Sequence, residues 1–126
     1  MTEEHPNVAL LKCLDLRNLA ASKGLIAEDV VWHYSNPNLP DMQGDYVGLD
    51  GVRSFFEAIA QKSGGTFQID PMSITAVGDE LVVVQSRNTL TFEGRSVTVV
   101  VWRIVGGRVV EVWDIVPGDA REVQNG

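Results

Sequence analysis

The chain has 126 residues and a formal net charge of −7, from 10 basic and 17 acidic residues. A chain of this length favours one domain with a buried core, and a hydrophobic content of 44% is typical of a globular protein. The acidic balance argues against nucleic-acid binding, which usually needs a basic patch. We therefore expect residues 1–126 to form a single domain that does not bind nucleic acid.

The N-terminal residues, MTEEHPNVAL, are acidic and lack the basic and apolar regions of a signal peptide. No apolar stretch approaches the ~20 residues of a membrane span. Cys13 is the only cysteine, so no internal disulfide can form, and its place in a helical pattern predicts a buried, inert thiol. These features predict a cytoplasmic protein that does not interact with membranes.

Residues 7–22 place apolar side chains at helical spacing, with Pro6 suited to the start of a helix and Gly24 to its end. A short helical turn over residues 24–29 and a β-rich strand over residues 29–36 are expected to follow.

Residues 37–48 are rich in proline, glycine and aspartate, so they predict a loop or a loose hairpin. Residues 48–63 then carry one apolar stripe, which predicts a second, longer helix.

After residue 65 the pattern changes to strands. Four segments rich in apolar and β-branched residues follow, separated by glycine-containing turns: residues 66–77, 80–92, 95–105 and 108–116. Helices followed by an antiparallel meander predict an α+β fold in which the helices cover one face of a curved sheet. The open end of such a sheet is a common position for a ligand pocket.

One carboxylate interrupts the last and most apolar strand. Asp114 shares one face of this strand with Val112 and Val116, whereas Glu111 and Trp113 share the other face. Since Glu111 needs water, its face must point outward or toward a partner. Asp114 is therefore predicted to lie on the inner, concave face.

The turn at residues 106–107 leaves the register of the last two strands open. A two-residue turn sets Val99 opposite Asp114, whereas a longer turn with a bulge sets Thr98 there and brings Trp102 onto the face of the carboxyl. We favour the second arrangement because it lines the inner face with Trp102.

Four stretches together resemble one fold family: EDVVWHYSNPN, GDYVGLDGVRSFFEAI, GRSVTVVVWRIVGGRV and VEVWDIVP. Their order resembles the nuclear transport factor 2-like superfamily, a cone-shaped, cystatin-like α+β fold, and within it the SnoaL-like, polyketide cyclase-like branch. The resemblance implies a curved antiparallel or mixed sheet with the N-terminal helices packed on its concave face. The superfamily includes isomerases, cyclases, epoxide hydrolases, dehydratases and non-catalytic proteins, so the resemblance names no reaction.

The resemblance also implies a role for Asp114, because SnoaL-like cyclases use an aspartate of the last strand as acid/base. Relatives similar to limonene-epoxide hydrolases pair this aspartate with an Arg-x-Asp, where this chain has residues 84–86, Val-Gln-Ser. Ketosteroid isomerases have a base aspartate where Tyr34 stands, and scytalone dehydratases need more than the two histidines present. These departures argue against all three chemistries.

An aspartate in an apolar cone should have a raised pKa, because burial disfavours its charged form, and this suits acid/base catalysis near neutral pH. Tyr34 or His33 could polarise a substrate oxygen, although His33 faces outward if Tyr34 faces inward. The candidate catalytic residues are therefore Asp114, Tyr34 and His33. The residues expected to contact the ligand are Trp32, Trp102, Phe55, Val100 and Val112.

Two functions remain open from the sequence. The chain is either a cofactor-free isomerase, cyclase or dehydratase that binds a small apolar metabolite, with Asp114 as acid/base, or a non-catalytic ligand-binding or dimerisation domain. No metal is expected, because Asp41 and Asp45 share a loop without further ligands. Apolar side chains on the outer face, including Trp113 and Ile115, predict a homodimer.

Overall fold

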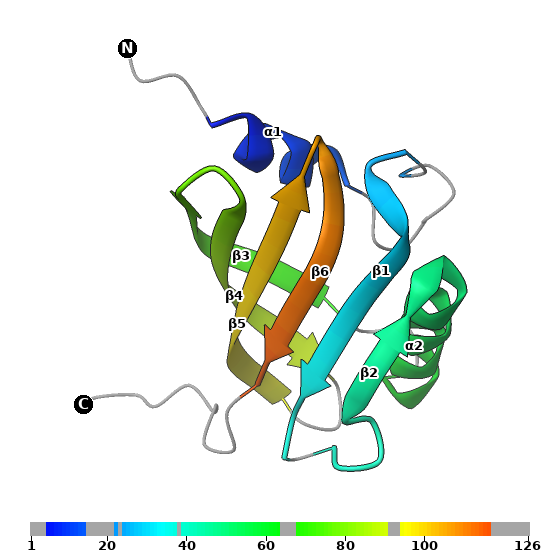
Figure 1. Ribbon diagram of the computed structural model, residues 1–126. Coiled ribbons are helices and arrows are strands. Elements are labelled where there is room, and N and C mark those ends of the chain that lie inside the picture. The colour runs from blue at the N-terminus through cyan, green and yellow to red at the C-terminus, as the bar shows by residue number, and fades with distance from the viewer. Residues whose placement is uncertain are drawn as a thin grey trace, which may run out of the picture.

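The computed structural model of the chain describes residues 5–14, 22, 24–37, 39–63, 68–90 and 94–116. Within these ranges the elements are α1 (Pro6–Cys13), β1 (Ile26–Ser35), β2 (Gly44–Val47), α2 (Gly48–Ser63), β3 (Gln68–Val77), β4 (Leu81–Leu90), β5 (Gly94–Val105) and β6 (Arg108–Ile115). The strands form one curved sheet in the order β2-β1-β6-β5-β4-β3 (Figure 1).

The sheet is mixed. β1 runs parallel to its neighbour β6, and every other pair of neighbouring strands is antiparallel. α2 packs against β1 and β2, while α1 contacts β3 and β4 (Figure 1). The predicted α+β fold, with helices on one face of a curved sheet, is confirmed.

α2 begins directly after β2 because Gly48 allows a sharp change of direction. Its φ of +78° lies in the left-handed region, where a side chain is strained, and an added Cβ would come within 3.3 Å of the carbonyl oxygen of Glu28. The predicted apolar stripe of α2 faces the sheet, and Val52, Phe55 and Ile59 are fully buried. The expected helix over residues 48–63 is therefore confirmed.

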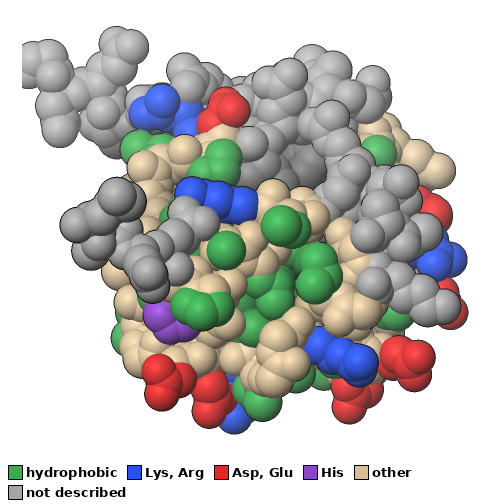
Figure 2. All heavy atoms as spheres, turned by 90° about the horizontal axis from the view of Figure 1, so that it is seen from above, with side chains coloured by type: hydrophobic (Ala, Val, Ile, Leu, Met, Phe, Trp, Pro, Cys, Tyr) green, Lys and Arg blue, Asp and Glu red, His purple; other side chains and the backbone are tan. Residues whose placement is uncertain are grey.

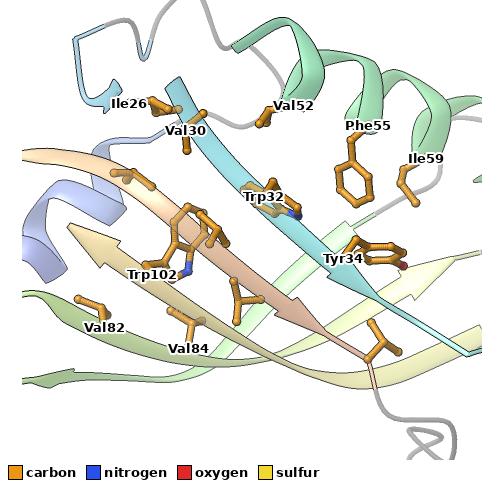
Figure 3. Packing of buried hydrophobic residues seen from close by; sticks show 14 of the residues in the cluster. Ile26, Val30, Trp32, Tyr34, Val52, Phe55, Ile59, Val82, Val84 and Trp102 are labelled. Atoms are coloured by element: carbon orange, nitrogen blue, oxygen red, sulfur yellow. The ribbon is translucent and has the colours of Figure 1, made fainter. Parts of the chain in front are cut away.

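The core lies between α2 and the concave face of the sheet. Trp32 and Tyr34 project from β1 toward Phe55 of α2, with ring centroids 5.8 Å and 4.7 Å from the Phe55 ring (Figure 3). Trp102 on β5 packs edge-on against Trp32, at 5.4 Å between centroids. Aromatic rings from two strands and one helix thus form the centre of the interior.

Several local predictions were wrong. The first helix begins at Pro6 as predicted but ends at Cys13, because Leu14 is extended; residues 15–21 lie outside the described part of the chain. Cys13 is exposed rather than buried. The turn expected over residues 24–29 is already strand from Ile26 onward, because Ile26 pairs with Val109 of β6.

The last hairpin starts in the register of the two-residue turn, with Ile104 opposite Val109, so the favoured longer turn was wrong; neither predicted register holds at Asp114. Gly106 and Gly107 form a two-residue turn, but a bulge at Val110 then shifts β6 by one residue. Val100, and not Val99 or Thr98, lies opposite Asp114. The bulge also places Val109 in the core, on the side of Val112. Trp102 nevertheless shares the inner face with Asp114, as the favoured arrangement required.

The outer face of the sheet carries an ionic clasp across three strands. His33 of β1 bonds through Nδ1 to Asp45 of β2 at 2.7 Å and through Nε2 to Glu111 of β6 at 2.6 Å. Its ring also stacks on Trp113, at 5.6 Å between centroids. Partial burial works to lower the pKa of His33, but the bonds and charges of Glu111 and Asp45 outweigh it and raise the pKa above its ordinary value.

Charged side chains are spread over the surface. Seen from above, hydrophobic side chains gather near the middle of the molecule, and acidic ones lie along the lower edge of the view (Figure 2). On the outer face, Arg103 lies opposite Glu111 in register, but its side chain pairs with Glu80 at 3.0 Å. Arg103 therefore does not form an ion pair with the carboxylate of Glu111 in the clasp.

The clasp predicts a pH-dependent contribution to stability. Since the folded-state pKa of His33 is raised, its contribution is full below the unfolded pKa of ~6.5 and is lost as pH rises through the folded pKa. Replacing His33→Gln should therefore reduce the free energy of unfolding in urea more at about pH 5.5 than at about pH 8.5, by less than about 1 kcal/mol because the pair is partly exposed. The double variant Asp45→Asn, Glu111→Gln should show the same pattern; an equal loss at both pH values would contradict it.

Packing of α2 on the sheet predicts a large stability effect at Phe55. Truncation by Phe55→Ala should lower the free energy of unfolding by about 3–5 kcal/mol, because it leaves a cavity among four aromatic rings. Glu57→Ala, at an exposed position of the same helix, is the control and should change stability by no more than about 0.5 kcal/mol. Equal effects would show that α2 does not form the core as described.

Candidate functional site

Asp114 lies on the inner face of the sheet, near the C-terminal end of the central strand β6. Tyr34 of β1 and Val100 of β5 are its neighbours in register on either side. The next row along the strands contains Trp32 and Trp102, which flank Val112 of β6. Alternation along β6 directs Asp114 inward, as predicted.

The Asp114 carboxyl is almost completely removed from water, with 8% of the residue exposed. Burial raises its pKa to about 7, because the charged form loses its hydration. Oδ1 has no hydrogen-bond partner among the described residues. At neutral pH the carboxyl is therefore divided between its charged and neutral forms.

The indole N–H of Trp32 is the protein group that works against this rise in pKa. The indole nitrogen therefore lies close to the carboxyl. The geometry is nevertheless poor for a hydrogen bond, because Trp32 Nε1 and Asp114 Oδ1 both lack a partner at hydrogen-bond distance and angle.

Other polar atoms on this face are also unsatisfied. Within the described part of the chain, Trp102 Nε1 and Thr98 Oγ1 are buried without a hydrogen-bond partner. Thr98 lies two residues from Val100 on β5, so it borders Asp114 on the side away from Trp102. Because buried polar atoms in proteins are nearly always paired, several unpaired atoms on one face set this face apart from an ordinary apolar core.

A buried Tyr–Asn pair adjoins the carboxyl. Asn36, just after β1, donates from Nδ2 to the hydroxyl oxygen of Tyr34 at 2.9 Å, and its own backbone N–H bonds to Gln43 Oε1 at 3.0 Å. These bonds hold the tyrosine ring in position. Asn36 was missed from the sequence, although its spacing of two residues from Tyr34 could have indicated a shared face.

The structure brings most of the predicted site residues together. Asp114 and Tyr34 lie in one cross-strand row, and the predicted ligand contacts share their core: Trp32, Trp102, Phe55, Val100 and Val112. His33 is separated from them, because it follows Trp32 on β1 and so lies on the outer face, in the ionic clasp. We therefore leave His33 out of the candidate site.

The described residues contain no group of three or more His, Cys, Asp or Glu side chains that could hold a metal ion. Asp41 instead pairs with Lys62 at 2.6 Å, which lowers the pKa of its carboxyl.

Among the described helices, none has both the length and the apolar character needed to cross a membrane.

Solved structures with similar folds cover most of the chain. An NTF2-like protein of unknown function from Burkholderia pseudomallei K96243 is 23% identical, with a TM-score of 0.72 over 90% of this chain and 92% of that chain. TerC, co-crystallised with polyporic acid, is 19% identical, with a TM-score of 0.72 over 89% and 92%. A candidate ketosteroid isomerase from Kribbella flavida DSM 17836 is 28% identical, with a TM-score of 0.66 over 100% and 87%.

A search of curated proteins found no match. The family profile of the SnoaL-like domain matches residues 8–112, which is most of the chain and includes both Trp32 and Trp102. Asp114 lies just beyond the matched residues, so its position rests on the strand register. The chain therefore belongs to the SnoaL-like domain family.

Proposed function

We propose that the chain is a cofactor-free acid/base enzyme. It binds a small, largely apolar carbonyl compound against the inner face of the sheet, and Asp114 moves a proton on that compound. The observation that carries the proposal is the burial of a single carboxyl whose pKa is raised to about 7, in contact with aromatic side chains. A proton donor or acceptor is most effective when its pKa lies near the working pH.

The proposed step is proton transfer next to a carbonyl group. The Asp114 carboxylate takes a proton from the carbon beside the carbonyl, which leaves an enolate and a neutral carboxyl. Return of that proton to a different atom of the enolate regenerates the carboxylate and yields an isomer. Because burial holds the pKa of Asp114 at about 7, both forms of the carboxyl that the cycle needs are populated.

Tyr34 is the proposed second participant. Asn36 donates to its hydroxyl oxygen and so orients the phenol, and the residue lies beside Asp114 in register. A donor in this position would stabilise the oxygen of a developing enolate. TerC, which has a similar fold, was co-crystallised with polyporic acid, which fits a ligand-binding role for the fold.

A second candidate function is ligand binding without catalysis. Asp114 is the only buried carboxyl among the described residues, and one buried carboxyl also suits a binding protein. The two functions differ in whether Asp114 exchanges protons with a bound ligand.

A substrate-independent assay can test the acid/base role. The ketone 2-tetralone exchanges the hydrogens beside its carbonyl for deuterium in D₂O, and NMR spectroscopy follows the exchange. We expect the protein to accelerate this exchange and Asp114→Asn to reduce the acceleration by about 100-fold. Because the carboxylate is the base, the rate should rise with pH up to about 7 and level off above it.

The matched control for this assay is Asp50→Asn, which removes an exposed carboxyl from α2. This variant should exchange at the wild-type rate. Binding of 2-tetralone without acceleration would favour the non-catalytic function. Equal acceleration by Asp114→Asn would contradict the role of Asp114 as the base.

We also infer that the protein is a homodimer formed through the outer face of the sheet. Ile115 is 41% exposed there. Trp113 of β6, Val101 of β5 and Val83 of β4 form an apolar row across the same face, because they are paired in register. A face of this kind usually meets a partner.

Sedimentation at micromolar concentration should therefore show a dimer. Ile115→Lys should shift it toward monomer, whereas Met72→Lys, on the edge strand β3, should not. A wild-type monomer under these conditions would contradict the inference.

A further inference from the structure

The buried polar atoms of the inner face limit which chemical groups a ligand can carry, whereas the apolar side chains limit only its size and shape. We propose that Trp32 and Trp102 are specificity-determining residues whose indole N–H groups bind an acceptor oxygen of the ligand. The site then takes a flat compound with a carbonyl, enolate or phenolate oxygen and discriminates against the corresponding hydrocarbon. This inference rests on the ligand-binding part of the proposed function, and of its three arguments only the one about charge uses the acid/base step.

The first argument concerns the unpaired donors. Trp32 and Trp102 are 3% and 7% exposed, and neither Nε1 atom has a partner at hydrogen-bond geometry among the described residues. The Trp32 indole does lie close enough to Asp114 to lower the pKa of its carboxyl. An indole nitrogen can only donate, so its partner must be an acceptor. Burying an unpaired donor costs about 1–3 kcal/mol, which phenylalanine at either position would avoid while still filling the core. The N–H groups therefore point to a function beyond packing.

The second argument concerns position. Trp32 on β1 and Trp102 on β5 flank the same residue of β6, Val112, in the row next to Asp114. The two rings meet edge-on at 5.4 Å, and both project from the sheet into one interior (Figure 3). An oxygen held by the Trp32 donor would thus lie close to the carboxyl that we propose removes a proton from the adjacent carbon.

The third argument concerns charge. Proton removal beside a carbonyl makes its oxygen negative, and N–H donors in a water-poor site stabilise that charge more than they stabilise the neutral ketone. Among the described residues, the inner face has no buried Lys, Arg or His that could stabilise this negative charge. The two indole N–H groups would therefore stabilise the negative oxygen, which the apolar side chains around it cannot do.

Trp113 provides an internal control. It is the third of the three tryptophans in the chain, and it lies on the outer face, stacked on His33. A ¹⁵N-labelled sample therefore gives three indole N–H signals, of which the inference assigns two to the site. The variants Trp32→Phe, Trp102→Phe and Trp113→Phe identify the signals by the one that each removes.

The experiment titrates the labelled protein with 2-tetralone and, separately, with tetralin, the hydrocarbon of the same shape. We expect 2-tetralone to move the Trp32 and Trp102 proton signals downfield while Trp113 stays in place, and to bind about tenfold more tightly than tetralin. Trp32→Phe and Trp102→Phe should each reduce that preference by about two- to tenfold, the usual effect of one hydrogen bond. Trp113→Phe should leave the preference unchanged. The wild-type signals alone test the inference even if a variant does not fold.

The outcomes separate this inference from the acid/base proposal. Equal binding of both probes, with no downfield shift, would overturn the role of the indoles and leave ligand binding intact. A downfield shift with 2-tetralone in a protein whose deuterium exchange does not depend on Asp114 would support the indoles and contradict the acid/base step. Failure of both probes to bind up to their solubility would contradict the ligand site and this inference together.

Discussion

One constraint shapes the inner face of the sheet: the carboxyl of Asp114 is buried in an apolar interior, at a cost in folding free energy. Asp114 has no cation beside it in the described structure, and the only group that eases its charge is the nearby indole of Trp32. Without an opposite charge, burial favours the neutral acid and brings the pKa to about 7. A carboxyl in this condition weakens the fold at neutral pH, because the unfolded chain would ionise it freely. Such a residue is more readily explained by chemistry than by packing.

Carboxyl groups on the two faces of the sheet are in opposite environments. On the outer face, the carboxylates of Asp45 and Glu111 share one histidine and keep access to water. On the inner face, Asp114 is the one buried charged residue described, and most of the buried side chains there are aromatic or aliphatic. Strand alternation produces both results from adjacent residues, since His33 lies beside Trp113 and Tyr34 beside Asp114 in the pairing of β1 with β6. The clasp holds the strands whose inner sides carry the site.

Patterns within one element were predictable from the sequence, whereas pairing between elements was not. The stripe of α2 and the inward direction of Asp114 follow from periodicity alone. The bulge at Val110 depends on how β5 and β6 fit together, so turn length could not give the register. Likewise, the start of β1 at Ile26 is set by Val109, which is distant in sequence. Asn36 was missed because its role arises only once Tyr34 is buried beside it.

The most direct test of the account is the titration of Asp114 itself. The carboxyl carbon can be followed by ¹³C NMR from about pH 2.5 to about pH 9, with Asp114→Asn identifying its signal. The account predicts a midpoint at about 7. A midpoint near the ordinary value of ~3.9 would show that the group is solvated or paired, and would contradict the proposal that a buried, unpaired acid carries the function.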